Sequence, residues 1–254
     1  MINSSKNNKD ILIFSGKKVG LESLKFLIDM DSPISKVIAS NKSDREILEI
    51  AEHNRIPIEI YSKNTQSDLI ANGDEYKWLL NLWSPFIIKK EVLLIAKHHL
   101  NIHPSLVPIC RGQDCAAWAI RNSLHAGVSL LEMSEGVDEG DVYVQKEIKY
   151  QFPISGKELH DMLQDESINL FRESWSSIYE GSIVPSPQFG EVSLFKRKNT
   201  EEDRSLDSSQ RMSIEEMVRW VMAHDFYPGT TAEIKSNEGE FRITLQIEKI
   251  TEVT

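Results

Sequence analysis

The sequence predicts an α/β fold in which helices cover both faces of a mostly parallel sheet, with a small C-terminal α+β unit after it. Two observations predict this fold class. Short apolar runs alternate with segments of helical period, and the connections between them are short, which is typical of parallel sheets. The chain has 254 residues, 40% hydrophobic and 27% charged, which suits a packed α/β domain with an appendage.

The first half of the chain supplies most of the expected sheet. Apolar runs predict strands at residues 11–14, 34–40, 57–61, 76–83 and 99–102, and helical periods predict helices at 21–30, 43–54, 65–71 and 89–98. Ser43, with Glu46 three residues later, predicts a capping box at the start of the second helix. Gly16 predicts a tight turn after the first strand, where Lys17 and Lys18 are either an anion contact or two solvated side chains.

The second half is expected to complete the sheet and then to change in character. We predict a helix at 113–123, strands at 127–133 and 142–150 around a loop at 135–141, and a long helix at 155–180. From Gly181 the chain is polar and contains prolines, and a helix at 212–224 and a hairpin formed by 231–235 and 241–250 follow. We therefore predict a main domain at 1–185, a connector at 186–210 and a helix-hairpin subdomain at 211–254.

Charge and cysteine content argue against several classes of protein. The formal net charge is −10 and no block of lysine or arginine is present, which disfavours a general nucleic-acid or anionic-membrane surface. Cys110 and Cys115 fit neither a disulfide framework nor a zinc ribbon, so a reducing compartment is expected. No apolar run approaches the roughly 18 residues of a membrane span, and the first residues are not a signal peptide. We expect a soluble, cytoplasmic protein with no nucleic-acid or membrane partner.

Three polar residues form the candidate site. Asn101 and His103 are two residues apart at the end of an apolar run, so in a strand they point to the same side, at the edge where open α/β sheets bind ligands. Asp138 lies in a loop with two glycines and four acids. An imidazole transfers protons near neutral pH, an amide donates to an oxyanion, and a carboxylate orients the histidine or takes a proton. Such a set suits attack of an amine or water on a carbonyl. The alternative is a histidine satisfied in a loop beside an asparagine in a turn.

Other sites have weaker support. Ser105 lies beside His103, but the G-x-S-x-G turn of a serine nucleophile is missing. None of the seven histidines forms H-E-x-x-H, and the acids at 135–141 do not match a calcium loop, so no metal site is expected. A G-x-G-x-x-G fingerprint for a dinucleotide is also missing.

The segment from Asn101 to Asp141 carries a specific resemblance. Its motifs are Asn101-Ile-His-Pro-Ser-Leu-Val-Pro108, Arg111-Gly112, Trp118-Ala-Ile120, Gly127-Val-Ser-Leu130 and Gly136-Val-Asp-Glu-Gly-Asp141. In their order and spacing they resemble the folate-dependent formyltransferases, which act on glycinamide ribonucleotide, methionyl-tRNA or sugar nucleotides. The resemblance covers roughly residues 10–185. It implies a Rossmann-like catalytic domain, an N10-formyltetrahydrofolate donor, no metal, and Asn101, His103 and Asp138 as catalytic residues.

The resemblance also implies a role for each residue. The acceptor amine attacks the formyl carbon, His103 and Asn101 stabilise the oxyanion, and Asp138 assists proton transfer and positions His103. The pterin is expected between 84–88 and 133–138, largely on backbone groups. The donor-binding candidates are Ser84, Phe86, Ile87, Ile88, Met133 and Gly136, with core packing as the alternative for residues 86–88. Cys115, Leu131 and Ser134 depart from the family pattern.

The acceptor is inferred from the C-terminal region. Residues 211–254 are only 44 long and hold five basic against eight acidic residues, which is a poor surface for RNA, and the segments at 196–203, 217–220 and 227–229 are similar to sugar formyltransferases. We expect a dTDP-, UDP- or GDP-linked 4-amino-4-deoxy sugar as acceptor, for surface polysaccharide (O-antigen) synthesis. The substrate-binding candidates are Lys17 and Lys18 for the diphosphate, Trp220 and Tyr227 for the base, and Arg111.

Three alternatives to this function stay open. They are a methionyl-tRNA formyltransferase-like enzyme, a formyltetrahydrofolate hydrolase in which water replaces the amine, and a folate- or nucleotide-binding regulatory module without turnover. A homodimer formed through the small C-terminal unit is a further expectation.

Overall fold

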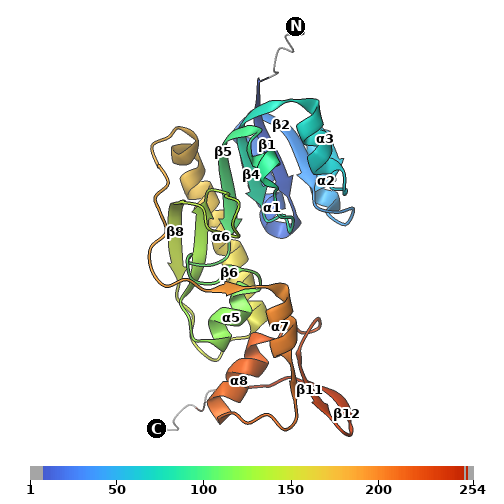
Figure 1. The fold of residues 1–254 in the computed structure, drawn as a ribbon, viewed down its shortest axis with the longest axis vertical. Coiled ribbons are helices and arrows are strands. Elements are labelled where there is room, and N and C mark those ends of the chain that lie inside the picture. Colours follow the sequence, from blue (N-terminus) through green and yellow to red (C-terminus); the bar gives the residue numbers. More distant parts are fainter. Residues whose placement is uncertain (1–7, 249, 251–254) are drawn as a thin grey trace. The chain divides into compact units, whose positions relative to one another are not determined.

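A computed structural model, which describes residues 8–248 and 250, confirms the α/β fold class (Figure 1). The helices are α1 (Lys17–Asp29), α2 (Arg45–His53), α3 (Thr65–Asn72), α4 (Lys90–Leu93), α5 (Cys115–Arg121), α6 (Gly156–Tyr179), α7 (Arg197–Arg204) and α8 (Ile214–Ala223). The strands are β1 (Asn8–Ser15), β2 (Ile34–Ala39), β3 (Ile58–Ile60), β4 (Glu75–Leu82), β5 (Ala96–His103), β6 (Arg111–Gly112), β7 (Ala126–Leu131), β8 (Val142–Ile148), β9 (Leu194–Phe195), β10 (Ser205–Asp207), β11 (Ala232–Ser236) and β12 (Gly239–Ile243).

The largest sheet has the order β3-β2-β1-β4-β5-β7-β8. The pairs β3–β2, β2–β1, β1–β4 and β4–β5 are parallel, whereas β5 and β7 are antiparallel. Because parallel strands all end at one edge, the carboxyl ends of β1, β4 and β5 lie together, and Figure 1 shows these strands side by side. This edge is where Asn101 and His103 end β5.

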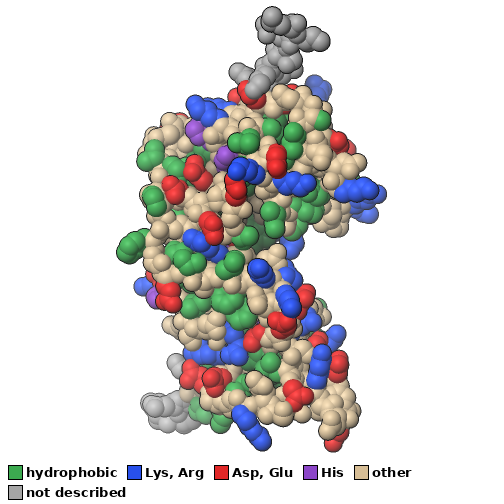
Figure 2. Space-filling view, viewed as in Figure 1, with side chains coloured by type: hydrophobic (Ala, Val, Ile, Leu, Met, Phe, Trp, Pro, Cys, Tyr) green, Lys and Arg blue, Asp and Glu red, His purple; other side chains and the backbone are tan. Residues whose placement is uncertain are grey.

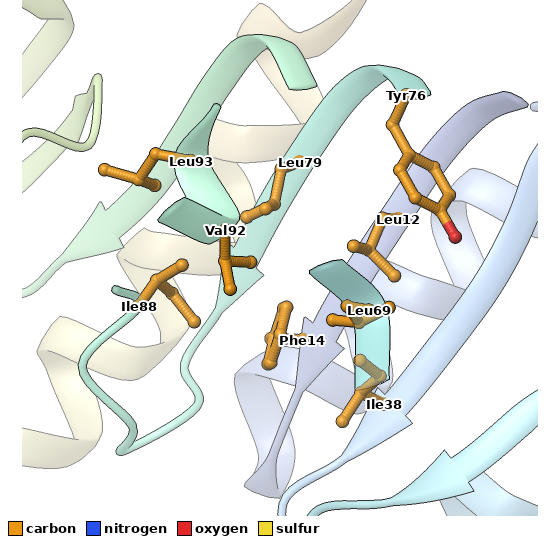
Figure 3. Close-up of a cluster of buried hydrophobic side chains, with 9 residues drawn as sticks. All are labelled: Leu12, Phe14, Ile38, Leu69, Tyr76, Leu79, Ile88, Val92 and Leu93. Atoms are coloured by element: carbon orange, nitrogen blue, oxygen red, sulfur yellow. The ribbon is translucent and has the colours of Figure 1, made fainter. Parts of the chain in front are cut away.

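Side chains alternate between the two faces of the sheet, and helices cover both. On one face, Phe14 of β1 and Leu79 of β4 join a buried cluster with Leu69 of α3 and Val92 of α4 (Figure 3). The full cluster consists of Leu12, Phe14, Ile38, Leu69, Tyr76, Leu79, Ile88, Val92 and Leu93. On the other face, Trp78 of β4 packs edge-on against Trp175 of α6 with 5.2 Å between ring centroids. The prediction of helices on both faces is therefore correct.

Two local predictions in this half are wrong. The helix predicted at 89–98 is only the single turn α4, because β5 starts at Ala96 and pairs with β4 along most of its length. The capping box predicted from Ser43 does not form. The N-cap of α2 is Asp44, whose carboxylate accepts backbone N–H bonds from Asn41 at 3.2 Å and Lys17 at 3.1 Å instead of capping the helix.

The chain divides into two compact units that are not consecutive in sequence. One contains residues 1–103, 128–146 and 164–189, and the other contains 104–127, 147–163 and 190–254. The sequential boundaries at 185 and 210 thus stay a prediction about domain organisation. The segment 186–210, expected to be a polar connector, contains β9, α7 and β10. Among the described residues, no helix is long and apolar enough to cross a membrane.

The second unit has its own core. Trp220 and Val221 of α8 and Ala232 of β11 are buried together, against partly buried residues of a sheet in the order β10-β11-β12. The hairpin prediction is correct for β11 and β12, but the second strand ends at Ile243 rather than 250, and residue 249 lies outside the described residues.

An aspartate of α7 connects two other helices within this second unit. Asp203 accepts hydrogen bonds from His224 Nε2 at 2.9 Å and from Arg121 Nε at 3.1 Å, and its carbonyl accepts one from Trp220 Nε1 at 2.6 Å. Burial by itself raises the pKa of Asp203, but the hydrogen bond from His224 and the charge of Arg121 outweigh burial and hold the pKa below its ordinary value.

Candidate active site

Strand β5 places Asn101 and His103 on one side of the sheet edge. The antiparallel neighbour β7 fixes their register, with Asn101 opposite Leu131 and His103 opposite Ser129. His103 is 4% exposed and Asn101 is half-buried. A polar ring at such depth needs polar partners, because burial without them costs free energy. The interpretation of these two residues as a pair on one strand face is therefore consistent with the register.

Asp138 lies beside both of these side chains. Asn101 Nδ2 donates a hydrogen bond to Asp138 Oδ1 at 3.1 Å. The other carboxylate oxygen is 3.5 Å from His103 Nδ1, a separation at which the carboxylate stabilises a protonated imidazole by charge rather than through a short hydrogen bond. The structure thus brings the three predicted catalytic residues into one cluster, although they are up to 37 residues apart in sequence.

The loop that carries Asp138 has an unusual backbone. Asp138 has φ +52°, in the left-handed region that aspartate adopts more readily than most residues other than glycine. At Gly140, an added Cβ atom would lie 2.0 Å from the carbonyl oxygen of Glu132, so only glycine fits there. The Glu132 N–H donates to the Asp141 carbonyl at 2.8 Å across the base of the loop. The close approach of the Glu132 backbone therefore explains the second glycine of the Gly136–Asp141 motif.

Sequence reasoning missed one residue next to this loop. Gln188 Nε2 donates to the carbonyl oxygens of Asp138 and Gly140, both at 2.8 Å. The sequence carries little sign of this contact. Gln188 is brought near the loop by the pairing of Ser186 with Val142, which is an isolated bridge and not part of a strand that a sequence pattern could predict.

The predicted donor-binding residues lie in two environments. Ile88 is buried in the cluster of Figure 3, and Met133 packs against that cluster, which agrees with core packing for both side chains. Phe86 stacks on Tyr61 with ring centroids 3.5 Å apart, and Ile87 is 76% exposed. The remaining two are Ser84, which is buried, and Gly136, which is half-buried in the Asp138 loop.

The loop after β4 is held from outside by one glutamine. Gln66 of α3 donates to the carbonyl of Ile87 at 3.0 Å and accepts from the Lys89 N–H at 2.8 Å. Ser84 N–H donates to Asn81 Oδ1 at 3.1 Å, but the Ser84 hydroxyl is buried and has no hydrogen-bond partner among the described residues. An unsatisfied buried hydroxyl is costly, and it suits a polar ligand at this loop.

The predicted substrate-binding residues are divided between the two units. In the first, Lys17 and Lys18 are exposed at the start of α1, and Lys18 forms an ion pair with Asp165 at 2.5 Å. In the second, Arg111 is half-buried in β6, and its backbone N–H donates to the carbonyl of Ser193 at 2.9 Å. Trp220 is 2% exposed inside a core, which favours packing over stacking on a base, whereas Tyr227 is 69% exposed.

Chemically, the cluster of Asn101, His103 and Asp138 supplies donors and a base without a nucleophile. The amide has a second N–H for a substrate oxygen, the imidazole has a second ring nitrogen, and the carboxylate can accept a proton. Ser105 does not add a nucleophile, because its hydroxyl donates to the carbonyl of Ile109 at 2.8 Å. The arrangement can stabilise an oxyanion and move a proton in one step.

Curated relatives in sequence are named methionyl-tRNA formyltransferase. The protein from Thermodesulfovibrio yellowstonii is 26% identical over 245 residues, covering 90% of this chain and 80% of its own. That from Clostridium tetani is 30% identical over 159 residues, covering 60% of this chain and 51% of its own. The chain thus spans about half of some of these relatives and four fifths of another.

Solved structures share the fold along nearly the whole chain. A sugar N-formyltransferase from Shewanella sp. superimposes with a TM-score of 0.80 at 15% identity, covering 96% of this chain and 99% of that one. A 4-N formyltransferase from Francisella tularensis gives 0.81 at 19% identity, covering 95% and 99%. An N-formyltransferase from Helicobacter canadensis gives 0.67 at 19% identity, covering 85% and 81%.

The family match covers the residues of the cluster themselves. Residues 29–173 match the family described as Formyl transferase, which is more than half of the chain. Asn101, His103 and Asp138 all lie within this match, at the sheet edge and on the loop described above. On the strength of this match, the chain belongs to the formyl transferase family.

Proposed function

We propose that this protein transfers a formyl group from N10-formyltetrahydrofolate to the amine of a nucleotide-linked 4-amino-4-deoxy sugar. The observation that carries the proposal is the cluster of Asn101, His103 and Asp138 in a chain of the formyl transferase family. In the reaction, the amine nitrogen bonds to the formyl carbon, the bond from that carbon to N10 breaks, the amine loses one proton, and N10 gains one.

Each residue of the cluster has a distinct role in this proposal. Asn101 donates its second amide N–H to the formyl oxygen, and His103 donates from Nε2 as negative charge develops there. The Asp138 carboxylate faces His103 Nδ1 at 3.5 Å, so it stabilises the protonated ring and fixes which nitrogen points to the substrate. The same carboxylate accepts the proton that the attacking amine loses.

For the donor, the first unit offers the loop after β4. Gln66 holds the backbone of this loop, and the exposed Ile87 offers apolar surface. The buried Ser84 hydroxyl has no hydrogen-bond partner among the described residues. These features suit a heterocycle with hydrogen-bonding edges, such as the pterin of a folate. The relative from Helicobacter canadensis was solved with folinic acid and dTDP-3-aminofucose, which supports both the donor and the class of acceptor.

For the acceptor, charge favours a small molecule over tRNA. Residues 211–254 carry a net charge of −3, which repels a polyphosphate backbone. On the face drawn in Figure 2, basic and acidic side chains are interspersed instead of gathered into one basic area. The name of the Shewanella relative supports a sugar amine, and the name of the Francisella relative, a 4-N formyltransferase, supports the 4-position. Among the predicted contacts, Lys17, Lys18 and Tyr227 are exposed to solvent and Arg111 is half-buried, and each stays a separate candidate contact for the nucleotide.

The experiment is incubation with N10-formyltetrahydrofolate and a panel of dTDP-, UDP- and GDP-linked amino sugars, read by mass spectrometry as the gain of one formyl group. We expect one 4-amino sugar to be formylated, and His103→Ala to lower its turnover by about 10³-fold, because a group that donates to the oxyanion is lost. The matched control is His125→Ala, which removes an exposed histidine paired with Glu147.

Three outcomes contradict the proposal in different ways. Formylation of methionyl-tRNA but of no amino sugar supports the alternative named by the sequence relatives. Release of formate at the same rate with and without amine identifies a hydrolase. Near-normal turnover of His103→Ala rules out the roles given to the cluster.

A further inference from the structure

The side-chain amide of Gln188 is bound to the loop that carries Asp138. Its nitrogen donates to the Asp138 carbonyl and to the Gly140 carbonyl, both at 2.8 Å. An amide nitrogen has two hydrogens, so these two bonds use both of them. Gln188 is half-buried, and its contacts join two segments that are 48 to 50 residues apart in sequence. It therefore holds the backbone of the loop on both sides of Glu139.

The sequence around Gln188 explains how it reaches the loop. Pro185 and Pro187 flank Ser186, and a residue before proline is restricted to extended backbone. Ser186 pairs with Val142 in an antiparallel bridge, with N–H bonds of 2.8 and 3.0 Å in both directions. In an antiparallel register, a step of two residues beyond Ser186 corresponds to a step of two before Val142. Gln188 is therefore opposite Gly140.

The loop needs such a support because its conformation is intrinsically unfavourable. Asp138 has a positive φ, which costs a residue with a Cβ atom about 1 kcal/mol or more unless surrounding contacts maintain it. With this backbone, its carboxylate contacts Asn101 and lies 3.5 Å from His103. A carboxylate displaced by about 1 Å from a productive geometry can cost on the order of 100-fold in rate.

We propose that Gln188 is a positioning residue, which holds the backbone of the Asp138 loop so that the carboxylate faces Asn101 and His103. The inference rests on the proposed formyl transfer for its kinetic consequence, but the structural part of it does not. In this proposal Gln188 acts through the position of Asp138.

The first test is independent of activity. Gln188→Met keeps the length of the side chain and removes both donors, and Gln188→Glu keeps the shape and places carboxylate oxygens against the two carbonyls. We expect hydrogen exchange of peptides from 134–141 to become at least about 5-fold faster in both variants, while peptides from β1 and β4 do not change. Gln210→Met, at an exposed glutamine of the other unit, is the control. Unchanged exchange in 134–141 would overturn the proposal, and faster exchange throughout would show a general loss of folding.

The second test uses formyl transfer. We expect Gln188→Met to lower kcat by about 30-fold with each KM within about 3-fold of wild type, because substrates still bind while Asp138 is misplaced. In an Asp138→Asn background the same substitution should cost less than about 3-fold, since its effect passes through that carboxylate. If Gln188→Met lowers kcat by the same factor in the wild-type and Asp138→Asn backgrounds, the two residues act independently, and the role of Gln188 through Asp138 is overturned. If the wild-type enzyme formylates nothing while the exchange result holds, the proposed function fails and the structural role of Gln188 stands.

Discussion

An aspartate faces a histidine in each of the two compact units, and the two clusters differ in the chemical type of the other groups that contact the carboxylate. In the second unit, Asp203 accepts hydrogen bonds from His224 Nε2 at 2.9 Å and from Arg121 Nε at 3.1 Å. In the first unit, Asp138 Oδ1 accepts a hydrogen bond from the neutral amide of Asn101 at 3.1 Å, and Asp138 Oδ2 is 3.5 Å from His103 Nδ1. The contacts of Asp203 include an arginine, which always carries a charge, whereas those of Asp138 include a neutral amide and a histidine ring at a longer distance.

The difference separates a structural cluster from a chemical one. Asp203 connects α5, α7 and α8, its side chain is 18% exposed, and its pKa is held below the ordinary value, all of which suit a charge that remains on the carboxylate. Asp138 sits instead on a loop with positive φ, beside a second proton carrier and a donor that can turn to a substrate. A carboxylate bound to an arginine between packed helices keeps its charge and stabilises the fold, whereas a carboxylate on a strained loop beside a histidine can take part in a reaction. The residue types alone do not distinguish the two cases.

The largest effect should come from removing the charge of Asp138. Asp138→Asn keeps the shape of the side chain but can neither accept the amine's proton nor stabilise protonated His103, so we expect kcat to fall by about 10³-fold. The melting temperature should stay within a few degrees of wild type, because asparagine has the shape of aspartate and keeps an oxygen that can accept the hydrogen bond from Asn101. Formylation assays and thermal denaturation of the same sample measure both. Retention of more than a tenth of the activity would contradict the assignment of Asp138.

The opposite pattern is expected at Asp203. Asp203→Ala leaves the buried His224 and the half-buried Arg121 without this partner, which should lower the free energy of unfolding by about 3 kcal/mol. For a chain of this size such a loss lowers Tm by roughly 6–12 °C. At a temperature where both proteins are folded, kcat should be unchanged. Asp207→Ala, in the neighbouring strand β10 and exposed, is the control and should affect Tm much less. Equal effects of the two substitutions would show that the Asp203 cluster does not stabilise the unit.

Much of the sheet could be predicted from the sequence, because buried parallel strands contain short apolar runs such as 11–14 and 78–80. The helix predicted at 89–98 failed for a physical reason. Its apolar residues fit both the helical and the strand period. The segment from Ala96 is a strand because it pairs with β4, with Tyr76 opposite Ala96 and Trp78 opposite His98. The capping box failed because Asp44 competes for the same position and binds the N–H groups of Asn41 and Lys17 instead.

The candidate site was predictable to a different degree at each residue. Asn101 and His103 share a strand face by simple alternation, and Asp138 was assigned through the motif that surrounds it. Gln188 was not predictable, because its place depends on the register of one bridge between distant segments. The Asp203 cluster was hidden for the same reason, since Arg121 and Asp203 are 82 residues apart. Sequence patterns predict the local geometry of strands and loops, whereas contacts between distant segments depend on how the whole chain folds.

Acid should weaken the Asp203 cluster. The folded pKa of Asp203 lies below its ordinary value of 3.8, so this group contributes stability that is fully present above the unfolded pKa and is lost as the pH falls through the folded pKa. We expect the Tm advantage of wild type over Asp203→Asn to be constant from pH 6 to 5 and to shrink as the pH falls below about 4. Thermal denaturation at steps between pH 6 and pH 3 measures it. An advantage that grows toward pH 3 has the wrong sign for this linkage.

The smallest effects concern one buried hydroxyl in each unit. The hydroxyls of Ser84 and Thr231 are both buried without a hydrogen-bond partner among the described residues. Removing an unsatisfied buried hydroxyl relieves a desolvation cost, so Ser84→Ala and Thr231→Val should each raise Tm by roughly 1–3 °C. The two substitutions should nevertheless differ in function. Only Ser84 lies at the loop to which we assign the donor, where a hydrogen bond to a bound pterin is worth about 1 kcal/mol.

We therefore expect Ser84→Ala to raise the KM for N10-formyltetrahydrofolate by about 5-fold and to leave the KM for the amino sugar unchanged. Thr231→Val should leave both constants unchanged while it stabilises the protein to a similar extent. Steady-state kinetics with each substrate varied in turn separate these results. If Ser84→Ala gains stability without any change in the KM for the donor, its hydroxyl is as irrelevant to binding as that of Thr231, and the donor must be placed on the backbone of the loop alone.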